Sequence, residues 1–353
     1  MNPRRLALLL LVCFAVLGLS ACDPNRQGHD MKTNATTLPL PPMRTHCIGR
    51  LLIDLPDDFE VAPLSEVELI YGLDENWRKV KVMAPRISQA QPGLETLVAQ
   101  HVTELTSLFD ADTPSKNKLD LQRRVDADTV LVRAHDEVAM QGYFKSIVFA
   151  RKEQAVGSFA AGVYKRDKAQ DIEAKLLSIA QSTRYLAEPS KAGRGTCLGP
   201  LLIDAGQDGE WFMLSFHSPK DPVLHIGVYM HSLRAKAEDG GLLDRTDRRT
   251  AEFLRPMGIK LNFFRRGKVS MAGGPGEEQA FRYEENGVEY LSFAAEVLQS
   301  SPATFAVPVI NVEMKLGGQL LSGEYRGASM SEKDALALWD AIIKSIRPRP
   351  GAV

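Results

Sequence analysis

The chain has 353 residues, of which 44% are hydrophobic and 25% are charged, a composition typical of an ordinary globular protein. Its 43 basic and 44 acidic side chains almost cancel, so the sequence lacks the basic footprint that nucleic-acid binding requires. The length is sufficient for two domains, each with a core of its own.

Residues 1–21 have the pattern of a bacterial secretion signal. Two arginines precede an apolar run from Leu6 to Leu17, and Leu-Ser-Ala-Cys follows shortly after it. The run is too short to be the preferred membrane anchor, because a spanning helix needs about 20 apolar residues. The last four residues resemble a lipobox, in which Cys22 would carry lipid and become the mature N-terminus. We therefore predict a periplasmic protein anchored by lipid to a cell-envelope membrane; an ordinary cleaved signal with an incidental cysteine is the alternative.

Residues 22–43 are predicted to form a flexible tether. The segment DPNRQGHDMKTNATTLPLPP, residues 23–42, is polar and has almost no apolar periodicity. Such a segment buries too little apolar surface to offset the entropy that ordering would remove. It would hold the folded part of the protein away from the membrane.

The remaining sequence opens twice with the same pattern. RTHCIGRLLID begins at Arg44, and RGTCLGPLLID begins at Arg194, with seven identical residues in register. Each half also ends in a predicted helix, over 168–183 and over 331–346, where Ser331 and Asp334 are typical of a helix start. Chance similarity between short apolar strands is the alternative to a duplication. We predict a duplicated domain with an N-terminal lobe at 44–185, a linker at 186–195 and a C-terminal lobe at 196–348.

Between these landmarks the sequence is rich in short apolar runs typical of strands. Alternation is clear in FKSIVF, residues 144–149, and in VEMKL, residues 312–316. An additional amphipathic helix is predicted over Leu94–Phe109. Runs of strands followed by a closing helix favour an α+β fold of two similar lobes, each with a mostly antiparallel sheet and a C-terminal helix. The predicted strands are 51–55, 80–83, 130–134, 143–150 and 156–164 in the first half, and 201–204, 211–216, 225–231, 279–283, 289–295 and 311–316 in the second.

Two cysteines of the mature chain occupy matching positions of the repeat. Cys13 leaves with the signal and Cys22 carries lipid, so Cys47 and Cys197 remain in an oxidising compartment. A disulfide between them would join the start of one half to the start of the other. Two buried free thiols are the alternative, since the sequence does not show whether the sulfur atoms approach each other.

No motif in the sequence indicates catalysis. The chain has no Gly-x-Ser-x-Gly, His-Glu-x-x-His, phosphate-loop or Cys-x-x-Cys pattern. His225 and His231 would share a strand face about 20 Å apart, too far for one metal ion. Asp54 and Asp204 match across the repeat, but each follows a strand, where aspartate usually bonds the backbone. We predict no enzyme activity, no catalytic residues, no metal and no cofactor.

The repeat together with the lipoprotein signal resembles a known family. Arg-x-x-Cys-x-Gly-x-Leu-Leu-Ile-Asp-Leu-Pro at residues 44–56, and a second such opening followed by Trp211 and Ser218-Pro219, look like the two-domain immunity proteins of bacterial type VI secretion. These proteins are the partners of phospholipase effectors. The resemblance implies an inhibitor that neutralises a lipase in the periplasm by holding its cap or lid between two lobes. A lipoprotein that binds a small ligand, or that scaffolds an envelope complex, is the alternative.

Charged segments between predicted elements are the candidate contacts for such a partner. Their charges give them the polarity of exposed loops, although most charged loops are simply solvated. The candidate residues are Asp57, Asp58, Glu60, Asp74, Glu75, Asp244 and Arg245.

Overall fold

The computed structural model describes residues 39–72, 78–87, 93–107, 118–136, 142–234, 240–256, 258, 260–297, 302–320 and 322–353. All of these residues belong to one compact unit, residues 37–353. Within the described ranges, no helix is both long enough and apolar enough to cross a membrane. The predicted signal, the lipidation residue Cys22 and most of the tether lie outside the described residues, as do Asp74 and Glu75.

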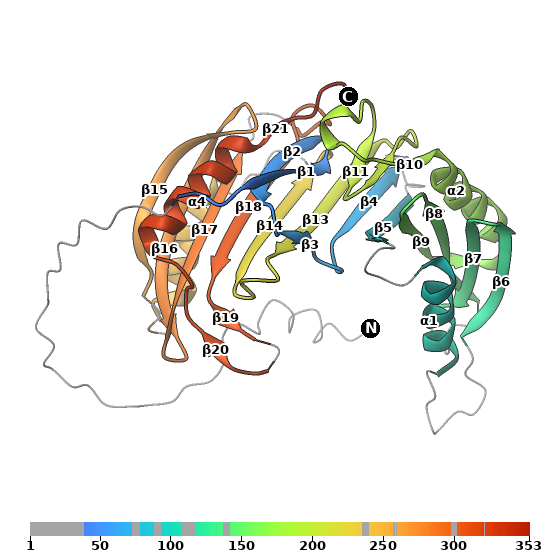
Figure 1. Ribbon diagram of the computed structural model, residues 1–353, viewed down its shortest axis with the longest axis horizontal. Helices are drawn as coiled ribbons and strands as arrows, with labels where there is room; N and C mark the ends of the chain where they lie inside the picture. Colours follow the sequence, from blue (N-terminus) through green and yellow to red (C-terminus); the bar gives the residue numbers. More distant parts are fainter. Residues whose placement is uncertain are drawn as a thin grey trace, which may run out of the picture. The chain divides into compact units, whose positions relative to one another are not determined.

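The largest element of the fold is an antiparallel sheet of thirteen strands (Figure 1). At its centre, β4 of the first half pairs with β13 of the second, and Val67 lies opposite Phe212. The first half contributes β3 (Glu60–Val61), β4 (Glu66–Tyr71), β5 (Arg78–Ile87), β6 (Leu119–Asp126), β7 (Thr129–His135), β8 (Tyr143–Lys152) and β9 (Ala155–Lys165). The second half contributes β13 (Gly209–His217), β14 (Leu224–His231), β15 (Asn262–Met271), β16 (Gly274–Glu285), β17 (Val288–Val297) and β18 (Val309–Leu316).

The strand order repeats on the two sides of this centre. Outward from β4 the order is β5, β9, β8, β7 and β6, and outward from β13 it is β14, β18, β17, β16 and β15. Only the short strand β3, which pairs with the end of β13, stands outside this order. The topology is therefore duplicated, as the sequence repeat predicts.

A second sheet of six strands is built from both halves. Its order is β10-β12-β11-β1-β2-β21, so the two hairpins that carry the repeated sequence lie side by side. The strand that closes each half pairs with the hairpin of the other half, β10 with β12 and β21 with β2. These strands are β1 (Met43–Gly49), β2 (Leu51–Pro56), β10 (Thr183–Tyr185), β11 (Thr196–Leu198), β12 (Leu201–Ile203) and β21 (Arg347–Pro348), and a separate pair is formed by β19 (Gly318–Gln319) and β20 (Tyr325–Arg326).

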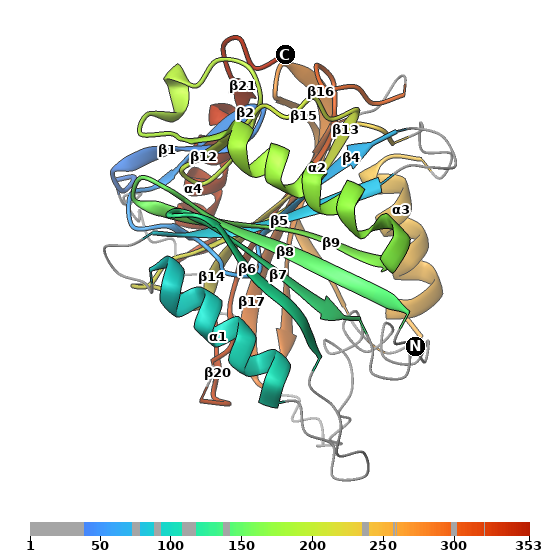
Figure 2. The ribbon, with the colours of Figure 1, turned by 90° about the vertical axis from the view of Figure 1, so that its right-hand side faces the viewer.

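Helices cover both faces of the large sheet near its ends. In Figure 2, α2 lies on one side of β6–β9 and α1 lies on the other. In the second half, α4 contacts β15, β17 and β2, and α3 contacts β16. The helices are α1 (Leu94–Ser107), α2 (Ala169–Ser182), α3 (Leu242–Arg249) and α4 (Glu332–Ser345), with short 3-10 turns at Arg166–Lys168 and Pro189–Lys191 and a π-helical turn at Thr250–Leu254.

The core lies between the large sheet and the layer formed by the small sheet, α2 and α4. On α4, residues three and four apart turn Leu338, Trp339 and Ile342 into this core. The buried indole Nε1 of Trp339 donates a hydrogen bond of 2.9 Å to Glu278 of β16. Ser331 caps the helix by accepting from the backbone N–H of Asp334, as the sequence predicts.

The α+β class and the mostly antiparallel sheet are confirmed. Two similar lobes, each closed by a C-terminal helix, remain a prediction, and the strands of both halves lie in one large sheet. Each half leaves strand edges that only the other half satisfies, because β4 pairs with β13 and the closing strands are exchanged. The predicted linker 186–195 is packed against the hairpins, with Leu186 and Ala192 buried beside Cys47 and Leu52. The boundaries 44–185 and 196–348 remain a prediction about the duplicated halves.

Candidate partner-binding face

The two faces of the large sheet differ at its centre. Along β13, Phe212, Leu214 and Phe216 point into the core and are almost completely buried. Successive side chains of a strand point to opposite faces, so Trp211 and Met213 lie on the other side. The side chain of Met213 is 48% exposed, and it therefore has no covering layer of the kind that α2 and α4 provide on the core face.

The outward side chains of the neighbouring strands continue this surface, since residues directly opposite in an antiparallel ladder share a face. Met213 lies opposite Tyr229 on one side and Glu66 on the other. We call this surface the open face. It comprises Lys79 and Lys81 of β5, Glu66, Glu68 and Ile70 of β4, Trp211, Met213 and Ser215 of β13, Tyr229 and His231 of β14, and Asn311, Glu313 and Lys315 of β18.

An aromatic cluster forms the middle of the open face. The rings of Trp211 and Tyr229 meet edge to face, with centroids 6.1 Å apart. Lys79 Nζ lies 5.8 Å from the centroid of the indole ring. Together with Ile70 and His231, these side chains line a shallow cavity of about 450 Å³. Half-buried Trp and Tyr side chains are characteristic of the anchor residues in protein interfaces.

Two ion pairs cross from β4 to β5 beside this cluster. Lys79 Nζ lies 2.7 Å from Glu68, and Lys81 Nζ lies 2.8 Å from Glu66. Both lysines remain more than 40% exposed, so solvent screens these pairs and they add little to stability. They give the face alternating charges that a partner with a complementary pattern can recognise.

The histidines of β14 are predominantly uncharged at neutral pH. Burial lowers the pKa of His231, and the cations Arg234 and Lys79 lower it further. Burial also lowers the pKa of His225. Within the described ranges, no group of three or more His, Cys, Asp or Glu side chains is arranged to hold a metal ion.

The structure separates the charged residues that the sequence singles out. Asp57 and Glu60 are exposed at the turn that leads into β3, and Asp58 accepts a hydrogen bond from the hydroxyl of Ser218. Glu60 lies opposite His217 at the end of β13, at the margin of the open face.

Asp244 and Arg245 lie far along the sheet from that turn, on α3. Asp244 is exposed, whereas Arg245 bonds Glu296 of β17 and the carbonyl of Gly240. Arg245 therefore holds α3 on the sheet. α3 packs on β16, whereas the turn leads to β3, which pairs with β13. Strands β17, β18 and β14 lie between β16 and β13 in the sheet, so the predicted contacts do not form one patch.

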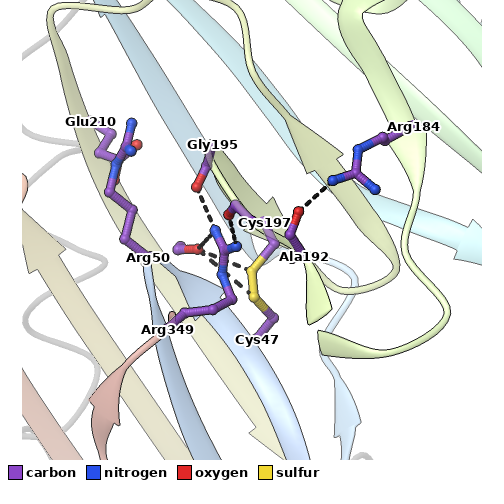
Figure 3. The surroundings of a disulfide bond; sticks show 10 residues. Cys47, Arg50, Arg184, Ala192, Gly195, Cys197, Glu210 and Arg349 are labelled. Atoms are coloured by element: carbon purple, nitrogen blue, oxygen red, sulfur yellow. Dashed lines mark hydrogen bonds and ion pairs between the residues drawn. A yellow bond between two sulfur atoms is a disulfide. The ribbon is translucent and has the colours of Figure 1, made fainter. Parts of the chain in front are cut away.

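The two repeated openings, at residues 44–54 and 194–204, meet at a disulfide (Figure 3). A bond joins Cys47 of β1 to Cys197 of β11, with their Cα atoms 5.9 Å apart and both side chains buried. Of the two alternatives that the sequence leaves open, this arrangement corresponds to the bridge. It closes 150 residues of chain and ties the hairpin of one half to the hairpin of the other.

A buried ion pair lies beside the disulfide. Arg50 Nε donates to Glu210 at 2.9 Å, and its guanidinium stacks on Phe305 at 4.1 Å. Glu210 is completely buried; burial raises its pKa, and the neighbouring Arg50 opposes that effect. Burial, reinforced by Arg50, lowers the pKa of Arg349 to about 10, and Arg349 donates to the carbonyls of Gly195 and Gly49. This group belongs to the junction of the halves and is not open to a partner.

The open face is not among the contacts predicted from the sequence. The sequence nevertheless contains one signal. WFMLSFH, residues 211–217, has large apolar side chains on both faces of the strand, whereas a strand with one solvated face usually alternates apolar and polar residues. Trp211 and Met213 are the additional apolar residues, and large apolar side chains on an exposed surface indicate an interaction site.

A family model matches the second half of the chain. Residues 189–351 match the model of the Tle cognate immunity protein 4 C-terminal domain. The resemblance to type VI secretion immunity proteins that the sequence analysis gave is therefore confirmed. A search of curated proteins found no match.

Solved structures extend the likeness over both halves. The apo structure of TplEi, an immunity protein of the type VI secretion system from Pseudomonas aeruginosa, has a TM-score of 0.60 at 20% identity and covers 88% of this chain and 98% of its own. The Tle4–Tli4 complex has a TM-score of 0.60 at 21% identity with the same coverage. TplEi complexed with a peptide has a TM-score of 0.57 at 21% identity, covering 87% and 98%. At 20–21% sequence identity, this structural similarity shows a common fold and nothing more.

Proposed function

We propose that this chain is an immunity protein that binds and inhibits a type VI secreted phospholipase effector. The observation that carries the proposal is the match of residues 189–351 to an immunity-protein family. The fold supports it, because both halves have the strand arrangement of solved immunity proteins. One of those structures is a complex of Tli4 with Tle4, and another is TplEi with a peptide.

The open face supplies a surface suited to such a partner. Trp211, Tyr229 and Met213 present apolar area at its centre, and alternating lysine and glutamate side chains border them. Interfaces that combine a few aromatic anchors with a charged border bind tightly and selectively. We propose that a lipase cap or lid docks here, where it would be held away from the lipid bilayer that contains its substrate.

Inhibition of this kind is stoichiometric and requires no chemistry from the inhibitor. One molecule occupies one lipase for as long as the complex lasts, so protection depends on affinity and on the amount of inhibitor. The proposed role is therefore that of a binding protein and not of an enzyme.

We further propose that the protein acts in the periplasm, attached by lipid at Cys22. The lipobox-like sequence supports the anchor, and a disulfide at Cys47–Cys197 suits an oxidising compartment. Several acyl chains on one cysteine would keep the protein on a membrane durably.

The proposal is tested by titrating the purified protein against its cognate type VI lipase effector, on phospholipid vesicles. A sharp end point near one molecule per lipase is expected, with fatty acid release as the readout. Absence of inhibition at saturating concentration would refute the immunity function. It would then favour the alternative, an envelope lipoprotein that binds a small ligand or scaffolds a complex.

A further inference from the structure

The shallow cavity on the open face has a fixed wall at the end of β14. Ser232 is buried there, and its hydroxyl bonds both the backbone N–H and the carbonyl of Glu210 in β13. The next residue, Leu233, lies over the sheet at Gly209, where an added Cβ would overlap Cδ1 of Leu233. Leu233 therefore occupies the space that the glycine leaves, and it forms part of the cavity lining.

This wall also fixes the protonation of His231, which lines the same cavity. The backbone N–H of Leu233 donates a hydrogen bond of 3.0 Å to Nδ1 of His231. A nitrogen that accepts a hydrogen bond carries no proton, so the neutral imidazole has its proton on Nε2. Among the described residues, none accepts a hydrogen bond from Nε2. His231 therefore offers a hydrogen-bond donor to an occupant of the cavity.

Lys79 adds a cation to the cavity lining. Its Nζ lies 2.7 Å from Glu68 and 5.8 Å from the centroid of the Trp211 ring, and its side chain remains 43% exposed. A solvent-exposed ion pair of this kind is weak. An ammonium group carries three N–H donors, so Lys79 can hold a second carboxylate without releasing Glu68.

The charges that act on His231 favour an anion in the cavity. Burial lowers the pKa of His231, the cations Arg234 and Lys79 lower it further, and Glu68 of β4 raises it. Tyr229, on the same strand as His231, is the other titratable side chain that lines the cavity. A carboxylate placed beside the imidazole would oppose the two cations and raise the pKa of His231.

The rest of the cavity lining suits the stem of a side chain. The two donors are surrounded by apolar and aromatic groups, and the volume of about 450 Å³ is ample for one side chain. An aliphatic stem that ends in a carboxylate matches this combination. The surrounding groups are Ile70, Trp211, Tyr229 and Leu233.

We propose that this cavity receives one acidic side chain of the lipase effector, whose carboxylate bonds Nε2 of His231 and the ammonium group of Lys79. The inference rests on the proposed function and specifies which group of the partner the open face recognises. The stem of the acidic side chain would lie against Trp211 and Leu233. Charge-assisted hydrogen bonds inside an aromatic rim give an interface both strength and selectivity.

The first test compares two amides at position 231. In His231→Asn the amide oxygen can still accept from the N–H of Leu233, as Nδ1 does, but the donor at Nε2 is lost. In His231→Gln the longer side chain carries its amide N–H₂ near the place of Nε2. We expect the asparagine variant to bind the cognate lipase about tenfold more weakly than the wild type, and the glutamine variant to bind within about threefold of it. Equal losses in the two variants, or no loss with asparagine, would overturn the role of His231.

The second test compares Lys79→Met with Lys81→Met. Both lysines belong to the open face and pair with a glutamate of β4, at 2.7 Å and 2.8 Å, but Lys81 is not part of the cavity lining. Methionine keeps the apolar stem and removes the charge. We expect Lys79→Met to weaken binding about tenfold, with a loss that shrinks as salt is added, and Lys81→Met to cost about threefold less than that. Equal losses would show that the cavity is not the recognition site.

The third test identifies the occupant as a carboxylate. A bound carboxylate raises the pKa of His231, so the complex takes up a proton as it forms, and affinity increases as pH falls. Between pH 8 and pH 6 the affinity of the wild type should increase about threefold more than that of His231→Gln, whose amide does not titrate. The same pH dependence in both proteins would exclude a carboxylate as the occupant.

The outcomes separate this inference from the proposed function. Thermal unfolding of each variant shows whether its fold is intact. If the wild type inhibits the lipase and His231→Asn and Lys79→Met inhibit it equally well, this inference is refuted and the immunity function stands. A wild type that binds no lipase would refute both.

Discussion

Replacing Arg50 with methionine should destabilise the protein by an amount that depends on pH. Arg50 Nε lies 2.9 Å from Glu210, whose side chain is completely buried. Methionine keeps the length and the apolar stem of the side chain but removes the charge. Glu210 then remains in a low-dielectric environment without its cation, and breaking a buried pair in this way typically costs about 3–5 kcal/mol.

The magnitude follows from the proton that Glu210 would take up. Burial already raises its pKa, and the loss of Arg50 removes the largest effect that opposes this rise, leaving the hydrogen bonds from Gln207 and Thr196. The unfolded chain loses this proton near its ordinary pKa of about 4.3, and each pH unit above that value costs about 1.36 kcal/mol. Keeping Glu210 neutral therefore costs up to about 4.4 kcal/mol at pH 7.5 and about 1.6 kcal/mol at pH 5.5. Because the folded pKa exceeds the unfolded one, stability is greatest at low pH and falls as pH rises.

The assay is urea unfolding of the wild type and the variant at pH 5.5 and pH 7.5. The double variant Arg50→Met, Glu210→Gln is the control, since the amide is neutral and can still bond Gln207 as Glu210 does. The double variant should recover most of the lost free energy of unfolding. Its free energy of unfolding should be the same at the two pH values. A loss that is equal at both pH values, or that the glutamine does not repair, would contradict the reasoning.

Three further predictions concern the anchor, the disulfide and the open face. Cys22→Ala should leave unprocessed or mislocalised precursor without lipid, and mass spectrometry that finds the wild-type mature chain unacylated would exclude the anchor. Non-reducing peptide mapping should recover Cys47 linked to Cys197, and serine at both positions should lower the free energy of unfolding by up to about 5 kcal/mol for a 150-residue loop; labelling of both thiols in unreduced protein would contradict it. Trp211→Ala should weaken lipase binding by about 2 kcal/mol with thermal unfolding unchanged, whereas Phe253→Ala, a control at a 60% exposed position on the π-helical turn, should not.

Local features of this protein could be predicted from its sequence alone. The helices predicted over 168–183 and 331–346 are observed at Ala169–Ser182 and Glu332–Ser345, because an apolar stripe and a cap identify a helix without reference to its neighbours. The repeat predicted a duplicated topology, since similar sequence patterns in the same order form the same elements. Strands without a clear alternation, such as Leu119–Asp126, were missed.

Only the tertiary structure decided how the halves combine and where a partner has access. The pairing of β4 with β13 and the exchange of β10 and β21 are contacts between segments far apart in the chain. Strand partners depend on which edges remain free after every other strand has paired, and a local pattern contains no such information. For the same reason Trp211 looks like a core residue in the sequence, although the structure places it on the open face. The sequence determined the elements and their duplication, whereas the pairing of edges determined the surfaces.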